Sequence, residues 1–453
     1  MELTTYKKKR IIPKDWKEIK LGEEFKTSSG ATPLSTKREY YEGGTISWIN
    51  SGELDSPFIY KAANFITQKG FDNSSTPIYP QDTILVAMYG ATAGKASLLK
   101  MEACTNQAIC AILPNKDYSP EFIKYNLDTL YDHLVGLSSG SARDNLSQAG
   151  IKELKLIVPQ TKREQESLVT ILSLIDKKIE LNRQINDNLE AMAKQLYDYW
   201  FVQFDFPNEE GKPYKSSGGA MVWNEKLKRE IPQGWGTQNL ADCLKLKTER
   251  VNSKDIKDTD NYTPIEVIPR KQMSLHETVA LENAMSGICR YSRRNILLSN
   301  RRVYFHKVCI APFDGLTRDT VLVLEPYNSG NLGYLYETVF ADEFILFATK
   351  HSYGSEQPVL SWTAAQKFNV LRPSNSIDKK YSKIVDSIIE SVLNNQIEII
   401  KLTKQRDELL PLLMNGQATV NYHLSLHLSN TVLYTLHYLG TVQNHVVRVL
   451  KII

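Results

Sequence analysis

The strongest candidate for chemistry in this sequence is a run of cations mixed with aromatic residues in the second half of the chain. Within 18 residues that contain no acid stand Arg290, Arg293, Arg294, Arg301, Arg302 and Lys307, with Tyr291, Tyr304 and Phe305 among them. Arginine donates paired hydrogen bonds to phosphate and to guanine edges, and interleaved aromatic rings suit a nucleic-acid surface. The run therefore predicts nucleic-acid binding, with a basic, solvated pair of strands as the alternative.

The first half of the chain offers fewer residues of this kind, and they are scattered. The candidates are Lys37, Arg38, Tyr40, Tyr89, Lys95, Arg143 and Asn145. Each of them alone is more often an ordinary surface residue than a reader of bases. They are kept as candidates because the two halves of the chain resemble each other, as shown below.

The stretch "YGATAGKAS" at residues 89–97 has the look of a phosphate-binding loop but fails its requirements. Such a loop needs four residues between its glycines and a hydroxyl after the lysine. Here three residues separate Gly90 from Gly94, and Ala96 stands where the hydroxyl would bind magnesium. The stretch therefore predicts a turn whose backbone approaches a strand or a ligand.

Other catalytic and metal-binding signatures are missing from the sequence. It has no glycine-rich dinucleotide fingerprint, no HExxH, no zinc-spaced cysteines and no Asp/Asn-Pro-Pro-Tyr signature of amino-methyltransferases. His423 and His427 have helical metal-ligand spacing, but β-branched neighbours argue against a helix there. We therefore expect no catalytic residues, no metal and no cofactor bound by this chain, which argues against a stand-alone nuclease or methyltransferase.

Composition indicates an ordinary soluble, multidomain protein of 453 residues. No window approaches 18 continuous apolar residues, so no membrane span is expected, and the N-terminus lacks an apolar signal core. The five cysteines are scattered, which is typical of reduced thiols. These features predict a cytoplasmic location without a membrane partner.

The chain repeats itself about halfway along. Ile-Pro-x-x-Trp begins at Ile12 and again at Ile231, an offset of 219 residues. The stretches "GSARDNLSQAGIKELKLIVP" and "GSEQPVLSWTAAQKFNVLRP" share Gly-Ser, Leu-Ser and a final Pro at an offset of 214, and apolar runs end at Pro114 and Pro326, 212 apart. A period this long excludes a solenoid and predicts two copies of one domain-sized module.

Both modules read as short β-rich runs separated by turns, such as "TILVAMY" in the first and "RVYFHKVCIAPF" in the second. Each module is followed by a long helical pattern, over residues 161–201 and 376–413. We therefore expect an α+β fold with a pseudo-twofold internal repeat.

Apolar residues recur at alternating spacings of four and three along both helical patterns, which indicates a coiled-coil seam. In the first helix the seam comprises Leu168, Leu172, Ile175, Ile179, Asn182, Asn186, Leu189, Ala193, Leu196 and Trp200. In the second it comprises Val385, Ile388, Val392, Asn395, Ile399, Leu402, Arg406, Leu409 and Leu413. Central asparagines would fix the register and the partner of each helix. The alternative is that each helix lies separately on its own module.

The expected domains follow from these patterns. They are a first module at 1–158, a long helix at 159–204, a connector at 205–230, a second module at 231–373, a second helix at 374–415 and a tail of uncertain structure at 416–453.

These landmarks resemble the DNA-specificity subunit of type I restriction–modification systems. The end of the first module resembles that family through Pro159, Glu164 and Gln165, and "GTISWINSGEL" and "DTILVAMYGATAGK" resemble strands of its recognition domain. The connector "LYDYWFVQFDFPNEEGKPYKSSGGAMVWNEKLKREIPQGW" is the most specific match. The resemblance covers residues 12 to about 415, whereas the tail after Gly416 matches nothing in the family.

The resemblance implies a division of labour. Each module would read half of a bipartite, asymmetric site in double-stranded DNA. The two helices would pack antiparallel as a coiled-coil spacer between the modules and recruit two modification subunits. Those partners would bind S-adenosylmethionine and methylate adenine, and restriction subunits would use ATP and magnesium. A tandem-domain adaptor that binds proteins is the alternative.

Overall fold

The computed structural model describes residues 12–139, 146–252, 256–257, 261–280, 287–374 and 377–418. The chain divides into two compact units. Among the described residues, unit 1 contains residues up to 177 together with 404–418, and unit 2 contains the described residues between 178 and 403. The long helices therefore do not form a domain of their own, because each unit includes a part of both.

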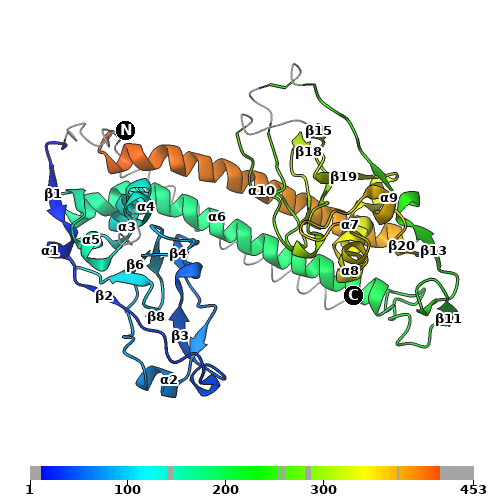
Figure 1. Cartoon of the computed structure of the whole chain (residues 1–453), viewed down its shortest axis with the longest axis horizontal. Coiled ribbons are helices and arrows are strands. Elements are labelled where there is room, and N and C mark those ends of the chain that lie inside the picture. The colour runs from blue at the N-terminus through cyan, green and yellow to red at the C-terminus, as the bar shows by residue number, and fades with distance from the viewer. Residues whose placement is uncertain are drawn as a thin grey trace. The chain divides into compact units, whose positions relative to one another are not determined.

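Unit 1 is built on a five-stranded sheet, a three-stranded sheet and a separate strand pair (Figure 1). The five-stranded sheet has the order β2 (Thr27–Ser29), β9 (Ile109–Ile112), β6 (Ile84–Ala87), β7 (Ala96–Leu99) and β4 (Phe58–Ile59). The smaller sheet joins β5 (Phe65–Ile66), β3 (Ile46–Ile49) and β8 (Cys104–Thr105), and β1 (Trp16–Lys20) pairs with β10 (Lys155–Pro159). The short helices are η1 (Arg38–Tyr40), η2 (Ser51–Glu53), α1 (Leu21–Glu24), α2 (Gln68–Asp72), α3 (Pro120–Asp128), α4 (Tyr131–Ser139) and α5 (Gln148–Lys152).

Unit 2 carries a four-stranded sheet in the order β14 (Leu244–Leu246), β19 (Val321–Pro326), β16 (Ile296–Ser299) and β17 (Val308–Ile310). Three strand pairs accompany it: β13 (Gly236–Asn239) with β20 (Asn369–Arg372), β15 (Ile288–Tyr291) with β18 (Gly315–Arg318), and β11 (Met221–Asn224) with β12 (Arg229–Pro232). Its short helices include η4 (Leu240–Asp242), η7 (Val303–Phe305), η8 (Ser329–Asn331), α7 (Leu332–Phe340), α8 (Asp342–Lys350) and α9 (Trp362–Ala365). Helices α7, α8 and α9 lie close together in this unit (Figure 1).

The central strands of both units are buried on both faces, which explains their unbroken apolar sequences. In unit 1, Ile84 and Val86 of β6 face one hydrophobic core, and Leu85 faces another. In unit 2, Ile296 of β16 faces the larger core and Leu297 a smaller one. Alternate residues of a strand point to opposite faces, so each sheet is covered on both sides.

The two units share the same local framework. Strand order β2-β9-β6-β7 in unit 1 matches β14-β19-β16-β17 in unit 2. In unit 1, β1 pairs with β10, the strand before α6, and in unit 2, β13 pairs with β20, the strand before α10. The Ile-Pro-x-x-Trp turns also match, since the Trp16 amide donates to the Pro13 carbonyl at 3.0 Å and the Trp235 amide donates to the Pro232 carbonyl at 3.1 Å.

A left-handed turn precedes the central strand in both units. Asp82 has φ +66° and Arg294 has φ +71°, and these positions are 212 residues apart. The Asp82 amide donates to the Leu99 carbonyl at 2.8 Å, and the Arg294 amide donates to the Ala311 carbonyl at the same distance. Left-handed backbone is costly for residues with a Cβ, so its occurrence at matching positions indicates that the framework imposes it.

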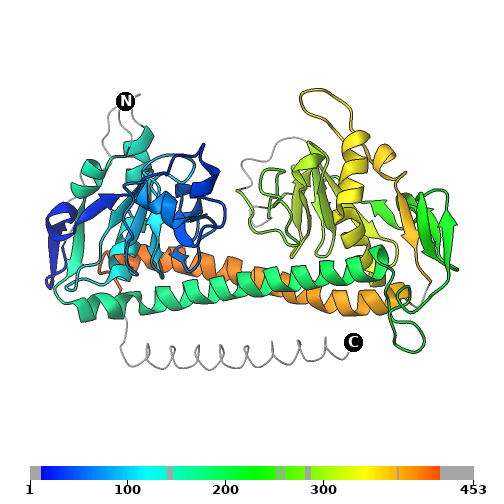
Figure 2. The same cartoon turned by 90° about the horizontal axis from the view of Figure 1, so that it is seen from below.

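The long helices begin and end close to the expected residues. Helix α6 spans Lys162–Tyr197, and η3 (Asp198–Val202) continues it as a π-turn. The Thr161 side chain caps α6, since its hydroxyl accepts from the Glu164 amide at 3.3 Å and the Glu164 carboxylate accepts from the Thr161 amide at 3.2 Å. Helix α10 spans Ile377–Met414 and is seen along its length in Figure 2. No described helix is long and apolar enough to cross a membrane.

The stretch "RVYFHKVCIAPF", expected as a β-rich run, is a strand only in part. Strand β16 ends at Ser299, Val303–Phe305 form the 3-10 helix η7, and β17 begins only at Val308. Arg302 and His306 flank η7 with φ of +48° and +56°. Two left-handed residues turn the chain sharply, and an extended strand does not accommodate them.

Candidate nucleic-acid interface

The basic run of the second module is divided between the two ends of β16. Arg293 and Arg294 precede this strand, and Arg301 and Arg302 follow it. A four-residue strand is ~13 Å long at ~3.3 Å per residue. The six cations therefore do not form a single patch.

The arginines before β16 are paired with acids on α10. The Arg293 guanidinium donates to Glu390 at 2.7 Å and to the Asn394 side chain at 3.1 Å. The Arg294 guanidinium contacts Glu390 as well and lies 3.3 Å from Asp386. These two cations are neutralised within unit 2 and are weak candidates for phosphate contact.

The arginines after β16 have more freedom. The Arg301 guanidinium donates to the Gln357 side chain at 3.3 Å and is exposed, and the Arg302 amide donates to the Pro358 carbonyl at 2.9 Å. Tyr304 on η7 is 49% exposed. Two cations and an exposed ring on a turn with fixed backbone form the best candidate interface of unit 2.

Arg290 and Lys307 have structural partners. The Arg290 Nε lies 3.6 Å from the Glu249 carboxylate. The Lys307 ammonium donates to the carbonyls of Ile265 at 2.7 Å and Glu266 at 3.0 Å, and burial lowers its pKa. Lys307 therefore holds a loop of its own module.

In unit 1 the candidates on η1 differ among themselves. Tyr40 is buried, and the Lys37 ammonium donates to its hydroxyl at 3.2 Å and lies over its ring. Arg38 is exposed, and its side chain makes no hydrogen bond or ion pair with the described residues. Arg38 is thus the residue of this group that is free to contact a ligand.

The "YGATAGK" stretch forms the tight connection between β6 and β7. The Gly94 amide donates to the Ala87 carbonyl at 2.9 Å, and a Cβ at Gly94 would lie 3.2 Å from Leu134 on α4. Lys95 forms an ion pair with Asp55, while Tyr89 is 40% exposed. The expected turn is therefore present, its backbone approaches a helix, and its lysine is occupied.

Arg143 and Asn145 lie outside the described residues, as do His423, His427 and the tail from residue 419. Among the residues that are described, no group of three or more His, Cys, Asp or Glu side chains could hold a metal ion.

Within unit 2, polar side chains pair α6 with α10. The Asn395 amide donates to the Asn186 side-chain oxygen at 2.9 Å, and the Asn182 amide donates to Glu398 at 2.8 Å. The partners run in opposite directions along the two helices, so the packing is antiparallel. Among the seam residues, Val392, Ile399, Ile179 and Asn182 are buried, while Leu189 and Ile388 pack at the edge of the core.

Within unit 1, the seam contains a buried ion pair. The Arg406 guanidinium donates to Asp176 at 3.0 Å, and the Tyr125 hydroxyl donates to the other Asp176 oxygen at 2.6 Å. The Asp176 side chain is 1% exposed. Of the expected seam residues here, Leu168 and Leu172 are buried, Leu409 packs against the same core, and Ile175 is partly buried. Leu402, at the neighbouring end of unit 2, is partly buried as well.

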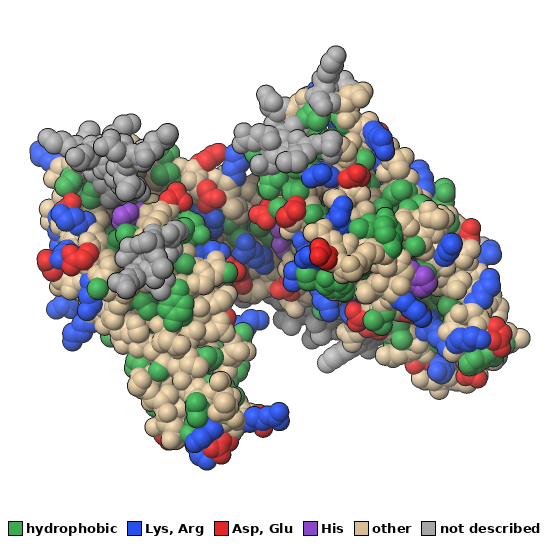
Figure 3. Space-filling model, viewed as in Figure 1, with side chains coloured by type: hydrophobic (Ala, Val, Ile, Leu, Met, Phe, Trp, Pro, Cys, Tyr) green, Lys and Arg blue, Asp and Glu red, His purple; other side chains and the backbone are tan. Residues whose placement is uncertain are grey.

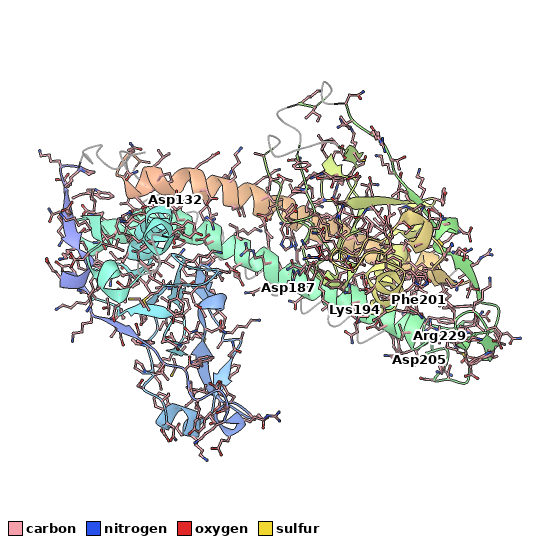
Figure 4. The ribbon with its side chains drawn as sticks, in the orientation of Figure 1. Asp132, Asp187, Lys194, Phe201, Asp205 and Arg229 are labelled. Carbon is pink, nitrogen blue, oxygen red and sulfur yellow. The ribbon has the colours of Figure 1, made fainter. Side chains whose placement is uncertain are left out.

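Unit 2 also contains a cavity of about 440 Å³ beside the last turns of α6. Lys194 and Phe201 line it from α6 and η3, and Arg229 lines it from β12, whereas Asp205 lies in the connector (Figure 4). Glu337 of α7 lines it too, and burial raises the pKa of this carboxyl to about 8.

Comparison with known proteins gives one consistent result. Residues 13–191 match the type I restriction modification DNA specificity domain. The type I restriction enzyme MjaIX specificity subunit of Methanocaldococcus jannaschii is 28% identical over 437 residues, covering 90% of this chain and 95% of the relative. The EcoR124I/EcoR124II specificity subunit of Escherichia coli is 25% identical over 205 residues, covering 43% and 49%.

The predicted resemblance to type I specificity subunits is therefore confirmed. Among solved structures, the S subunit of a type I system from M. genitalium has a similar fold, with a TM-score of 0.51 at 17% identity over 91% of this chain and 98% of that chain.

Sequence reasoning missed three residues beside the exposed turn of unit 2. The Arg270 guanidinium lies 4.2 Å from the Phe305 ring centre, the Lys271 amide donates to the His306 carbonyl, and Tyr353 is 64% exposed. They come from distant segments, so no local run of cations marks them. Lysine and arginine side chains alternate with acids over the visible face of this unit (Figure 3).

Proposed function

We propose that this chain is the sequence-specific DNA-binding subunit of a type I restriction–modification complex, and that each module reads one half of a bipartite, asymmetric target. The observation that carries the proposal is the shared framework of the two units within a chain similar to specificity subunits over 95% of the length of one relative. Two modules with one framework and different exposed side chains suit two different half-sites.

The matching left-handed turns show how one framework supports different surfaces. At this position unit 1 has Asp82, which binds Lys100 at 2.9 Å, and unit 2 has Arg294, which turns to α10. A backbone that stays constant while its side chains vary leaves each module free to present different residues to DNA elsewhere on its surface. The internal repeat is thus part of the proposal and gives a reason for two readers.

The helices have two roles in this proposal. A helix of 36 residues is ~54 Å long at 1.5 Å per residue, so the antiparallel pair can serve as a coiled-coil spacer between the readers. Its outer faces would recruit two modification subunits, which bind S-adenosylmethionine and methylate adenine. Restriction subunits with ATP and magnesium would complete the assembly, and this chain itself would be non-catalytic and cytoplasmic.

The alternative of a protein-binding adaptor without DNA specificity is not favoured, since the relatives are named as restriction-enzyme specificity subunits. The exposed Arg301 and Tyr304 and the partly exposed Arg302 also suit DNA better than an acidic or apolar partner.

The proposal is tested by sequencing methylated adenines in host DNA with and without this gene. We expect one bipartite motif to lose methylation when the gene is deleted. In vitro, the purified chain should transfer no methyl group until its modification subunit is added. An unchanged methylation pattern after deletion, or turnover by the chain alone, contradicts the proposal.

A further inference from the structure

The turn before β16 is joined to α10 by a group of charged side chains, here called the α10 clamp: Arg293, Arg294, Asp386, Glu390 and Asn394. The Glu390 carboxylate accepts from both arginines, one on each oxygen. Asn394 receives a second bond from Arg293, and Asp386 lies within ion-pair distance of Arg294. The side chains of the four charged residues are 27–39% exposed, so water screens them only in part.

The arginine side of the clamp is held rigidly by its own turn. The Arg293 amide donates to Asp314 at 2.7 Å, and the Ser292 amide donates to the Asn295 side chain at 2.7 Å. Arg294 is fixed in left-handed backbone by its bond to Ala311. Non-glycine residues are kept in this conformation only where surrounding contacts impose it, so the two guanidinium groups leave the turn in defined directions.

The helix side of the clamp is equally fixed. Asp386, Glu390 and Asn394 follow one another at intervals of four residues and share one face of α10. The adjacent face, with Val385, Ile389 and Leu393, is fully buried in the core of unit 2. The clamp therefore joins two rigid elements, the turn that starts the central strand and the spacer helix.

The described residues of unit 1 show no such link at the matching position. Asp82 binds Lys100, which binds Glu121 of α3 at 2.6 Å, so these contacts stay inside the first module. The clamp is thus specific to the second module and is not a requirement of the shared framework.

We propose that the α10 clamp is a positioning device, which fixes the orientation of the second module on the spacer helix and thereby the distance at which its half-site can be read. The inference rests on the proposed function. Arg293 and Arg294 then act on spacing through α10 and do not contact DNA, and the bases that the second module reads do not depend on them.

The test uses the full chain assembled with its modification subunit and duplexes that carry its methylation-mapped target with the native spacer, one base pair more, or one fewer. In Glu390→Gln the charge is lost and the shape is kept. We expect the preference for the native spacer over the altered spacers to fall about tenfold, which corresponds to ~1.4 kcal/mol. Preference for the specified bases should stay unchanged.

Two further variants separate positioning from stability. Arg294→Gly relieves the left-handed backbone while removing the guanidinium, so its melting temperature should stay near that of the parent while its spacer preference falls. Glu408→Gln is the matched control, because Glu408 is 66% exposed on the same helix and pairs only with Lys404, as far as the described residues show. Its spacer preference should not change.

Three results would overturn the inference or its basis. Full spacer preference in both Glu390→Gln and Arg294→Gly refutes the clamp while leaving the proposed function intact. Tighter binding of Glu390→Gln at every spacing, with a steeper dependence on salt, shows that the freed arginines contact phosphate and also refutes it. A parent complex without any spacer preference refutes the proposed function itself.

Discussion

Removing Arg406 should destabilise unit 1 more than any exposed substitution on α10. Its guanidinium is the only cation within hydrogen-bonding distance of Asp176 among the described residues, and the Asp176 side chain is 1% exposed. Breaking a buried ion pair from one side costs ~3–5 kcal/mol. We expect about 3 kcal/mol for Arg406→Met, because the Tyr125 hydroxyl still donates to Asp176 and the arginine is itself 24% exposed.

The assay is urea unfolding of the full chain followed by circular dichroism. Four variants are compared with the parent: Arg406→Met, Asp176→Leu, the two combined, and Lys404→Met. Lys404→Met is the matched control, since Lys404 is 78% exposed and its ion pair with Glu408 is 4.0 Å long. It should change the unfolding free energy by less than ~0.5 kcal/mol. Arg406→Met combined with Asp176→Leu should recover most of the loss, because apolar replacement of both partners is often neutral.

This reasoning is refuted if Arg406→Met is no more costly than Lys404→Met. It is also refuted if the double substitution costs as much as the two single substitutions added together, since the loss would then not come from an unpaired Asp176.

Three other predictions follow from particular side chains. Burial raises the pKa of the Glu337 carboxyl from 4.5 to about 8. The folded state therefore keeps a proton that the unfolded chain loses, and the free energy of unfolding should fall as pH rises between these values. Glu337→Gln should remove this fall and raise the free energy of unfolding at pH 8 by ~2 kcal/mol, measured by unfolding at a series of pH values. The double variant Arg301→Ala, Arg302→Ala should lower the slope of log K for DNA binding against log salt by about one unit for each lost phosphate contact. If an arginine instead reads guanine, the variant should lose ~1–3 kcal/mol of binding free energy on one DNA sequence only. DNA-binding titrations that match the parent at all salt concentrations would contradict both outcomes. Lys307→Met should leave that salt dependence unchanged while lowering the melting temperature, because its ammonium serves two backbone carbonyls.

Much of the framework could be predicted from the sequence because it depends on local chemistry and on repetition. The Ile-Pro-x-x-Trp turns, the buried central strands and the bounds of α6 and α10 all follow from residue type and spacing. The expected seam was too narrow, since Ile389 and Leu393 are fully buried as well. Helix α10 packs against both α6 and the second module, which widens its apolar face beyond a two-helix seam.

The interface was harder to predict, because the spacing of residues in the sequence does not show which part of the fold each side chain reaches. Arg294 and Arg301 lie seven residues apart in one basic run, yet they leave opposite ends of β16. The partners of Arg294 stand almost a hundred residues further along the chain, on α10. A cation's neighbours in the fold decide whether it is free for DNA, and those neighbours are set by tertiary packing.

The central claim is that the two modules are independent readers of one bipartite site. The most direct measurement is methylated-adenine sequencing after residues 231–373 are replaced with the second module of a relative. The account predicts that one half of the methylated motif changes while the other half stays the same. A motif that changes in both halves, or in neither, would contradict it.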